Sequence, residues 1–186
     1  MIRYLNFIGA VIIITIMTAC GQVQQKDRQK VDRTDWKTFT HRDYSIQYPD
    51  WVELNTSGIN GTSFMLYLEE FSLNEMIRSS INLLIQDLNA LNMNISFDEY
   101  VKLSENQVKT LITGGKIIKS QRFEKDNSEF QEFIWTGRQG KFIFKCKQYY
   151  TIKNGKAYVL TLTTDIKEFD RYKTVGTEIM DIFRIR

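Results

Sequence analysis

The sequence is poor in the residues that most often build catalytic and metal sites. Its 186 residues include one histidine, one proline and two cysteines. A metal cage built on several histidines is therefore excluded. His41 stands in a polar turn beside Arg42 and Asp43, where no partner for general acid-base work is evident, so we expect a surface residue. The sequence consequently predicts no catalytic residue, no metal site and no cofactor.

A hydrophobic run long enough to stay in a membrane is also missing at the N-terminus. The apolar stretch over residues 7–17 is shorter than the roughly 20 residues that a spanning helix needs. It follows a cationic start at Arg3 and ends in small residues, which is the order of a secretory signal. The sequence Met17-Thr18-Ala19-Cys20 resembles the bacterial lipobox, with methionine in place of the more usual leucine.

This resemblance implies a lipoprotein signal peptide over residues 1–19 and lipidation, with palmitate among the acyl chains, at Cys20. An ordinary secretory signal with an incidental Cys20 is the alternative. Each buried methylene of an acyl chain contributes about 0.8 kcal/mol, so two or three chains would anchor the protein durably. Cys146 would then be the only free thiol, so no intramolecular disulfide is expected. Its position amid apolar strand residues predicts core packing rather than nucleophilic chemistry.

Residues 20–35 lack hydrophobic periodicity and are polar and charged, so they predict a flexible tether between the lipid and the domain. A linker of this length has a reach on the order of 20 Å. Residues 36–186 are of ordinary single-domain length. The formal net charge of +3 is too small to indicate a nucleic-acid partner.

Short strand-like runs and two helical patterns make up the predicted domain. Ser96 and Glu99 form a capping-box pattern before a helix that ends at the glycines 114–115. Asp165 and Glu168 precede a second helix that runs to about residue 183. Asn154-Gly155 predicts a tight hairpin. Strands are expected at 36–39, 44–49, 63–69, 81–86, 116–124, 129–136, 141–152 and 156–163, with a possible helical turn at 73–78.

Large apolar residues alternate onto both faces of the last four strands. If Arg138-Gln139 is a two-residue turn, Trp135 lies opposite Phe142 and Glu132 lies opposite Lys145. A sheet that is apolar on both faces must be covered on both. The predicted fold is therefore α+β, with a central, mostly antiparallel β-sheet covered by helices on both faces.

Three segments, residues 44–51, 157–164 and 182–185, resemble the PsbP-like and DcrB-like proteins, several of which are small bacterial lipoproteins. The resemblance covers nearly the whole mature chain, but it rests on core and turn residues. It implies a PsbP-like α+β fold and a role in binding rather than in chemistry, because the members of the group share binding rather than a reaction.

Charged groups offer two weaker site hypotheses. Lys141, Lys145 and Lys147 share one face of their strand, but Glu132 is placed to pair with Lys145, so a solvated charge pair is favoured over an anion site. Carboxylates gather near strand ends without the repeated Asp-x-Asp loop of a calcium site. They are Asp43, Asp50, Glu69 and Glu70.

The leading hypothesis is a membrane-anchored, non-catalytic envelope lipoprotein that binds an envelope protein or a small ligand through a sheet edge or a helix-sheet crevice. It would be extracytoplasmic. Gly21 lacks the aspartate that retains some lipoproteins at the inner membrane, which favours the periplasmic side of the outer membrane in a double-membraned cell. The alternatives are an extracytoplasmic hydrolase using carboxylates and a secretion-system chaperone, which the signal disfavours.

We expect Cys20→Ser to abolish incorporation of radiolabelled palmitate and to release the protein from the membrane fraction, because no other thiol follows a lipobox-like sequence. Cys146→Ser is the matched control and should label as the unmodified protein does. Labelling that survives Cys20→Ser would refute lipidation at this residue.

Overall fold

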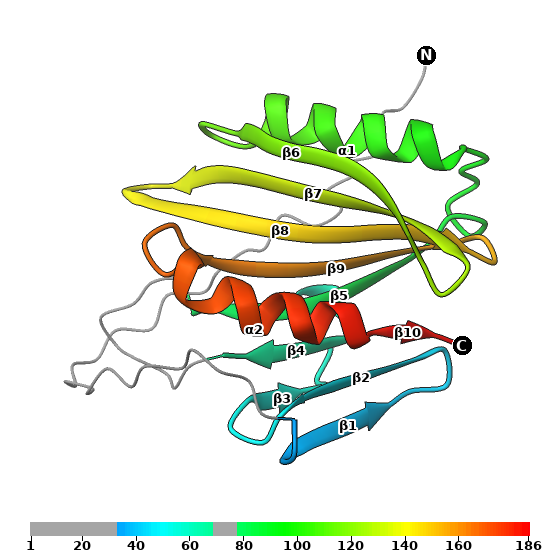
Figure 1. Ribbon diagram of the computed structural model, residues 1–186. Helices are drawn as coiled ribbons and strands as arrows, with labels where there is room; N and C mark the ends of the chain where they lie inside the picture. Colours follow the sequence, from blue (N-terminus) through cyan, green and yellow to red (C-terminus); the bar gives the residue numbers. More distant parts are fainter. Residues whose placement is uncertain (1–32, 69–77) are drawn as a thin grey trace.

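Ten strands, two α-helices and a short 3-10 helix make up the part of the chain that the computed structural model describes, residues 33–68 and 78–186 (Figure 1). The predicted Cys20 anchor, the signal peptide, most of the tether and most of the possible turn at 73–78 lie outside these residues. In chain order the elements are β1 (Trp36–Thr40), β2 (Tyr44–Pro49), β3 (Glu53–Asn55), η1 (Ile59–Gly61), β4 (Phe64–Tyr67), β5 (Ser80–Asp87), α1 (Phe97–Leu111), β6 (Lys116–Lys125), β7 (Ser128–Gln139), β8 (Phe142–Lys153), β9 (Lys156–Asp165), α2 (Phe169–Ile182) and β10 (Arg184–Ile185).

The strands form two antiparallel sheets rather than the single central sheet that the sequence predicts. The larger has the order β3-β4-β5-β9-β8-β7-β6, and the smaller has the order β1-β2-β10. The third strand of the small sheet is β10, in which Arg184 and Ile185 pair with Ser45 and Tyr44. Two-residue strands such as β10 are too short to produce a periodic signal.

Two-residue turns join the strands of the meander. The predicted Asn154-Gly155 hairpin is confirmed, with φ of 53° and 70°. Asp126 and Asn127 also have positive φ, 51° and 55°, so this turn is one residue shorter than expected. Positive φ at both central residues gives the primed turn whose twist matches that of the flanking strands.

The turn between β7 and β8 is Gly140-Lys141, with Gly140 at φ 58°, and not Arg138-Gln139 as predicted. Trp135 consequently lies opposite Cys146 instead of Phe142. The displacement is an even number of residues, so each side chain stays on the sheet face that the alternation assigns to it. The cross-strand partners were therefore predicted wrongly and the faces correctly.

The two helices begin differently. In α1 the predicted capping box is confirmed, because Ser96 Oγ accepts from the Glu99 amide and the Glu99 carboxylate accepts from the Ser96 amide. Before α2 the predicted box is absent, since Glu168 makes no side-chain cap and Asp165 accepts from the Lys167 amide instead. Tertiary packing of its apolar face is then the main force that holds α2.

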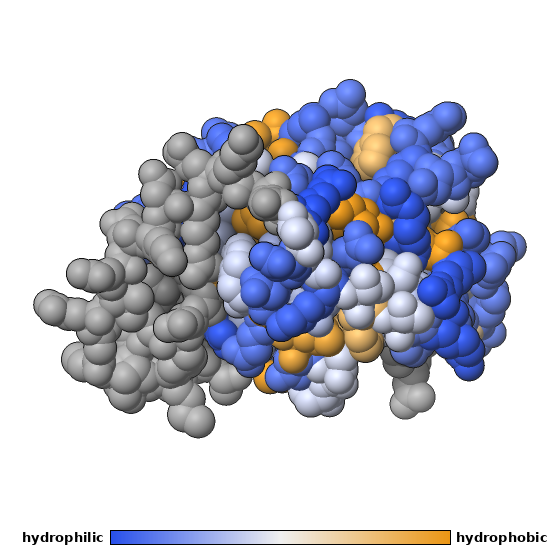
Figure 2. All heavy atoms as spheres, turned by 60° about the horizontal axis from the view of Figure 1, so that its bottom comes forward, coloured by the Kyte–Doolittle hydropathy of each residue, from blue (hydrophilic) through white to orange (hydrophobic). Residues whose placement is uncertain are grey.

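Each helix packs into a different hydrophobic cluster. The first cluster joins α2 to the small sheet and to β9, and it includes Tyr172, Ile179 and Leu160. The second joins α1 to the meander, and it includes Tyr100, Val108 and Val159. An α+β architecture is thus confirmed. On the face that Figure 2 shows, exposed hydrophobic residues form small patches between charged ones.

We expect Ser96→Ala to lower the free energy of unfolding by about 1 kcal/mol, because the first turn of α1 loses its hydrogen-bond acceptor. The melting temperature should fall by about 2–4 °C in a domain of this size. Thr110→Ala is the control: its hydroxyl donates to the Asn106 carbonyl inside the same helix, and alanine is the better helix former. Thermal unfolding followed by circular dichroism would contradict the prediction if both variants melted together with the unmodified protein.

Candidate functional site

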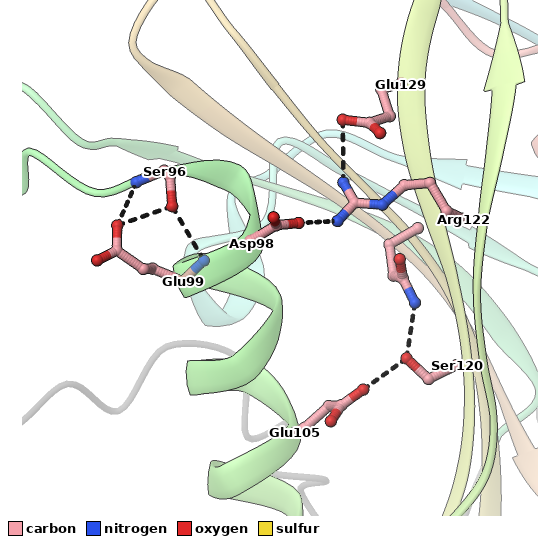
Figure 3. Close-up of polar contacts among 8 residues, drawn as sticks. Ser96, Asp98, Glu99, Glu105, Ser120, Arg122 and Glu129 are labelled. Atoms are coloured by element: carbon pink, nitrogen blue, oxygen red, sulfur yellow. Dashed lines mark hydrogen bonds and ion pairs between the residues drawn. The ribbon is translucent and has the colours of Figure 1, made fainter.

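Polar contacts join α1 to strands β6 and β7 (Figure 3). Arg122 of β6 pairs with Asp98 of α1 and lies 3.1 Å from Glu129 of β7. Its guanidinium also sits 4.2 Å from the centre of the Phe97 ring. Nearby, the Ser120 hydroxyl donates to Glu105 and accepts from the Gln131 amide. These contacts hold the helix in place.

The predicted surface histidine and two of the four predicted carboxylates lie around β2. The His41 ring stacks on Tyr44, with centroids 4.8 Å apart. Asp43 pairs with Arg42 at 2.9 Å and with Lys156 at 3.4 Å, and the hydrogen bond from Arg42 holds the pKa of Asp43 at about 2.

Asp43 and Asp50 flank opposite ends of the six-residue strand β2, so they are separated by roughly 20 Å of extended chain. These two carboxylates do not converge on one site. Glu69 and Glu70 lie outside the described residues. Within residues 33–68 and 78–186, no group of three or more His, Cys, Asp or Glu side chains is placed to hold a metal ion.

The predicted pair between Lys145 and Glu132 is wrong. Glu132 instead pairs with Lys119 and with Lys147, whose Nζ lies 3.1 Å from Glu132 Oε1. Lys147 is buried and also donates to the Thr177 hydroxyl of α2 at 2.8 Å. Burial opposes ionisation of Glu132, but the hydrogen bonds from the two lysines outweigh it and keep the pKa of this carboxyl below its usual value.

Cys146 is buried, as its position predicted. Its sulfur lies 3.6 Å from the Thr163 hydroxyl, and burial raises the pKa of the thiol to about 12. A thiol with so high a pKa supplies almost no thiolate at neutral pH. The geometry therefore gives Cys146 a packing role.

A band of uncharged polar side chains crosses the middle of the large sheet, and sequence reasoning missed it. Gln148 occupies its centre: its Oε1 accepts from Trp135 Nε1 at 2.7 Å and from the Tyr150 hydroxyl, and its Nε2 donates to Thr161 at 3.0 Å. Cross-strand pairing places Asn82 beside Thr161. We define the polar band as Ser80, Asn82, Cys146, Gln148, Thr161 and Thr163, all of which are buried.

Asn82 is the member of the polar band whose hydrogen bonding is incomplete. Its side chain is 3% exposed, and within the described part of the chain its Nδ2 has no hydrogen-bond acceptor. Buried donors without an acceptor are rare because each one loses its hydrogen bonds to water. An oxygen from a ligand, a partner or a bound water would complete the group.

The polar band consists almost entirely of neutral groups. Apart from Cys146 it contains no ionisable group, so it has no general acid or base at neutral pH. Alternating amides and hydroxyls can donate to and accept from a neutral polar molecule. In the sequence these residues are inconspicuous, because threonine is common in strands. The signal that could have been used is Asn82, a polar residue within the otherwise apolar run of β5.

No protein-family model and no curated protein sequence matches the chain. Several solved structures resemble it in fold. Cyanobacterial PsbP (CyanoP) from Synechocystis sp. PCC 6803 has a TM-score of 0.58 at 13% identity, covering 91% of this chain and 99% of that one. LpqN, described as involved in cell envelope biogenesis of Mycobacterium tuberculosis, has a TM-score of 0.54 at 10% identity, covering 81% and 90%.

A third structure, PA94 of unknown function from Pseudomonas aeruginosa, has a TM-score of 0.56 at 11% identity, covering 78% of this chain and 94% of that one. Identities this low bear on the fold alone. The class that they define is the PsbP-like fold, so this part of the predicted resemblance is confirmed.

We expect Glu132→Gln to destabilise the protein by about 3 kcal/mol at neutral pH, because Lys147 is left buried beside an uncharged group. The folded-state pKa of Glu132 is lower than its unfolded value, so its contribution is complete above the unfolded value and is lost as the pH falls through the folded one. The variant should therefore lose part of the unmodified protein's sensitivity to acid.

Urea unfolding from neutral pH down to pH 3 measures both effects. Glu124→Gln, an exposed residue of β6, is the control and should change neither. Equal stability of Glu132→Gln and Glu124→Gln at neutral pH would contradict the assigned ion pair.

Proposed function

We propose that the chain is a lipid-anchored, non-catalytic protein of the bacterial cell envelope that binds a protein partner or a small ligand. The observation that carries the proposal is Met17-Thr18-Ala19-Cys20 at the end of a signal-like segment. The polar tether that follows would keep the domain near the membrane. The described residues contain no helix long and apolar enough to cross a bilayer, and the lipid would supply the attachment.

The polar band supports binding as the activity of the domain. Asn82 belongs to it by strand pairing with Thr161, and Asn82 Nδ2 has no hydrogen-bond acceptor within the described part of the chain. We infer that α1 and α2 cover opposite faces of the large sheet. Support comes from Val159 and Leu160, neighbours on β9 that belong to the α1 cluster and the α2 cluster respectively.

Membership of the DcrB-like lipoproteins and an extracytoplasmic location belong to the same proposal. The likeness to LpqN, an envelope protein by its description, is compatible with them. The hydrolase alternative gains no support from Asp43 and Asp50, because they lie at opposite ends of β2. The chaperone alternative requires a cytoplasmic protein, and the signal-like segment disfavours it.

Crosslinking in intact cells followed by capture of the full-length protein tests this function. We expect a specific protein or small molecule to co-purify and its yield to fall at least tenfold in Asn82→Leu, which removes the polar amide at similar size. Thr151→Val, at a buried strand threonine outside the polar band, is the control and should retain the ligand. Recovery of nothing, or of the same molecules with both variants, would count against the proposed binding site.

A further inference from the structure

Two exposed isoleucines form a pair at one end of the large sheet. The turn between β7 and β8 and the loop between β9 and α2 meet there, at the left of Figure 1. The Ile166 amide donates to the Ile143 carbonyl at 3.0 Å, which continues the pairing of β8 with β9 beyond Phe144 and Asp165. Ile143 is 44% exposed and Ile166 is 40% exposed. Because directly paired residues point to the same face, these two side chains are neighbours.

Five cations surround this isoleucine pair. Arg138 lies opposite Ile143 across the strand pair, and Lys167 follows Ile166 in the chain. We define the basic tip as Ile143 and Ile166 together with Lys116, Arg138, Lys141, Lys145 and Lys167.

Among the described residues, no carboxylate lies within ion-pair distance of these five cations. The nearby acids are already engaged: Asp165 accepts from the Lys167 backbone amide, and Asp170 pairs with Lys173 at 2.8 Å. Lys145 instead lies over the Phe169 ring, 3.9 Å from its centre. Lys145 also feels the charge of Asp170, but the five cations leave the basic tip with an excess of positive charge next to exposed hydrocarbon.

We propose that the basic tip docks on the surface of an anionic phospholipid membrane, with the isoleucine pair entering the headgroup region and the cations facing lipid phosphates. Exposed aliphatic residues within a basic surround are the combination that binds anionic interfaces. A second copy of the chain is a poor occupant, because two such tips would repel one another. The proposal rests on the proposed lipid anchor, which would hold the domain at such a surface.

The place where the chain enters the domain is compatible with this orientation. Arg33 lies 3.9 Å from Glu178 of α2. Phe169, beneath Lys145 at the tip, is the first residue of that helix, and Glu178 follows it by nine residues, which is about 14 Å along the helix axis. A tether reaching on the order of 20 Å from the lipid is long enough for the tip to meet the membrane.

The test uses the lipidated protein reconstituted in vesicles and labelled with an environment-sensitive fluorophore at Ile143→Cys. Cys20 would be consumed by lipid and Cys146 is buried, so the label reports on position 143 alone. In phosphatidylglycerol vesicles we expect a blue-shifted emission that a lipid-attached quencher reduces, and in phosphatidylcholine vesicles a spectrum as in water. Leu91→Cys, at a 44% exposed residue in the loop that follows β5 at the opposite end of the sheet, is the control label and should remain in water in both.

A triple variant should lower the equilibrium constant for docking of the tip about a hundredfold, because each lysine near an anionic surface contributes about fivefold. Its substitutions are Lys141→Gln, Lys145→Gln and Lys167→Gln. A label at position 143 that stays in water on anionic vesicles, while the protein remains bound through its lipid, would overturn the proposal. Equal insertion of the label into neutral vesicles would also overturn it. So would a label that leaves water only when envelope proteins are added, which would identify an acidic protein as the occupant. Failure of the lipid anchor is seen separately, as loss of palmitate labelling.

Discussion

Alternation of side chains along β8 and β9 is the constraint on which the rest of the structure depends. These two strands occupy the centre of the seven-stranded sheet, and every residue on them must face one of two sides. Leu160 and Leu162 face the cluster that contains α2, while Val159 faces the cluster that contains α1. The same period places Thr161 and Thr163 on the face of the α1 cluster, where their hydroxyls belong to the polar band. One periodicity thus produces both the hydrophobic packing and the polar band.

This constraint also explains why the faces could be predicted and the register could not. Face assignment needs only the parity of each residue, which the apolar alternation gives directly. The register also depends on which residues form the turn, and the predicted turn, Arg138-Gln139, lies two residues before the observed one. Gly140 was needed for positive φ, which moved the partner of Trp135 from Phe142 to Cys146. Because Glu132 depends on the register, its true partners Lys119 and Lys147 were not predicted, although the face that it shares with Lys147 was.

Other features escaped prediction because they depend on contacts between distant segments. The small sheet needs β10, whose two residues pair with β2 across most of the chain. The start of α2 lacks the capping box that Asp165 and Glu168 suggested, since Asp165 is used in the preceding turn. Asn82 interrupts the apolar run of β5, but its significance depends on the neighbours that β9 and β8 bring to it. Local sequence patterns do not show which distant segments come into contact.

The lysines in and just before β8 differ in burial, because this strand runs from the exposed tip into the core. Lys147 lies beneath α2, where burial requires a partner, and it has Glu132 and Thr177. Two residues earlier, Lys145 lies over the Phe169 ring, and Lys141 lies in the turn close to the exposed Ile143. A buried ammonium without a counter-ion would be strongly destabilising, whereas a solvated one is not, so the carboxylate is placed where burial demands it. The lysines at the tip are solvated and need no buried counter-ion, so the strand can end in an excess of positive charge.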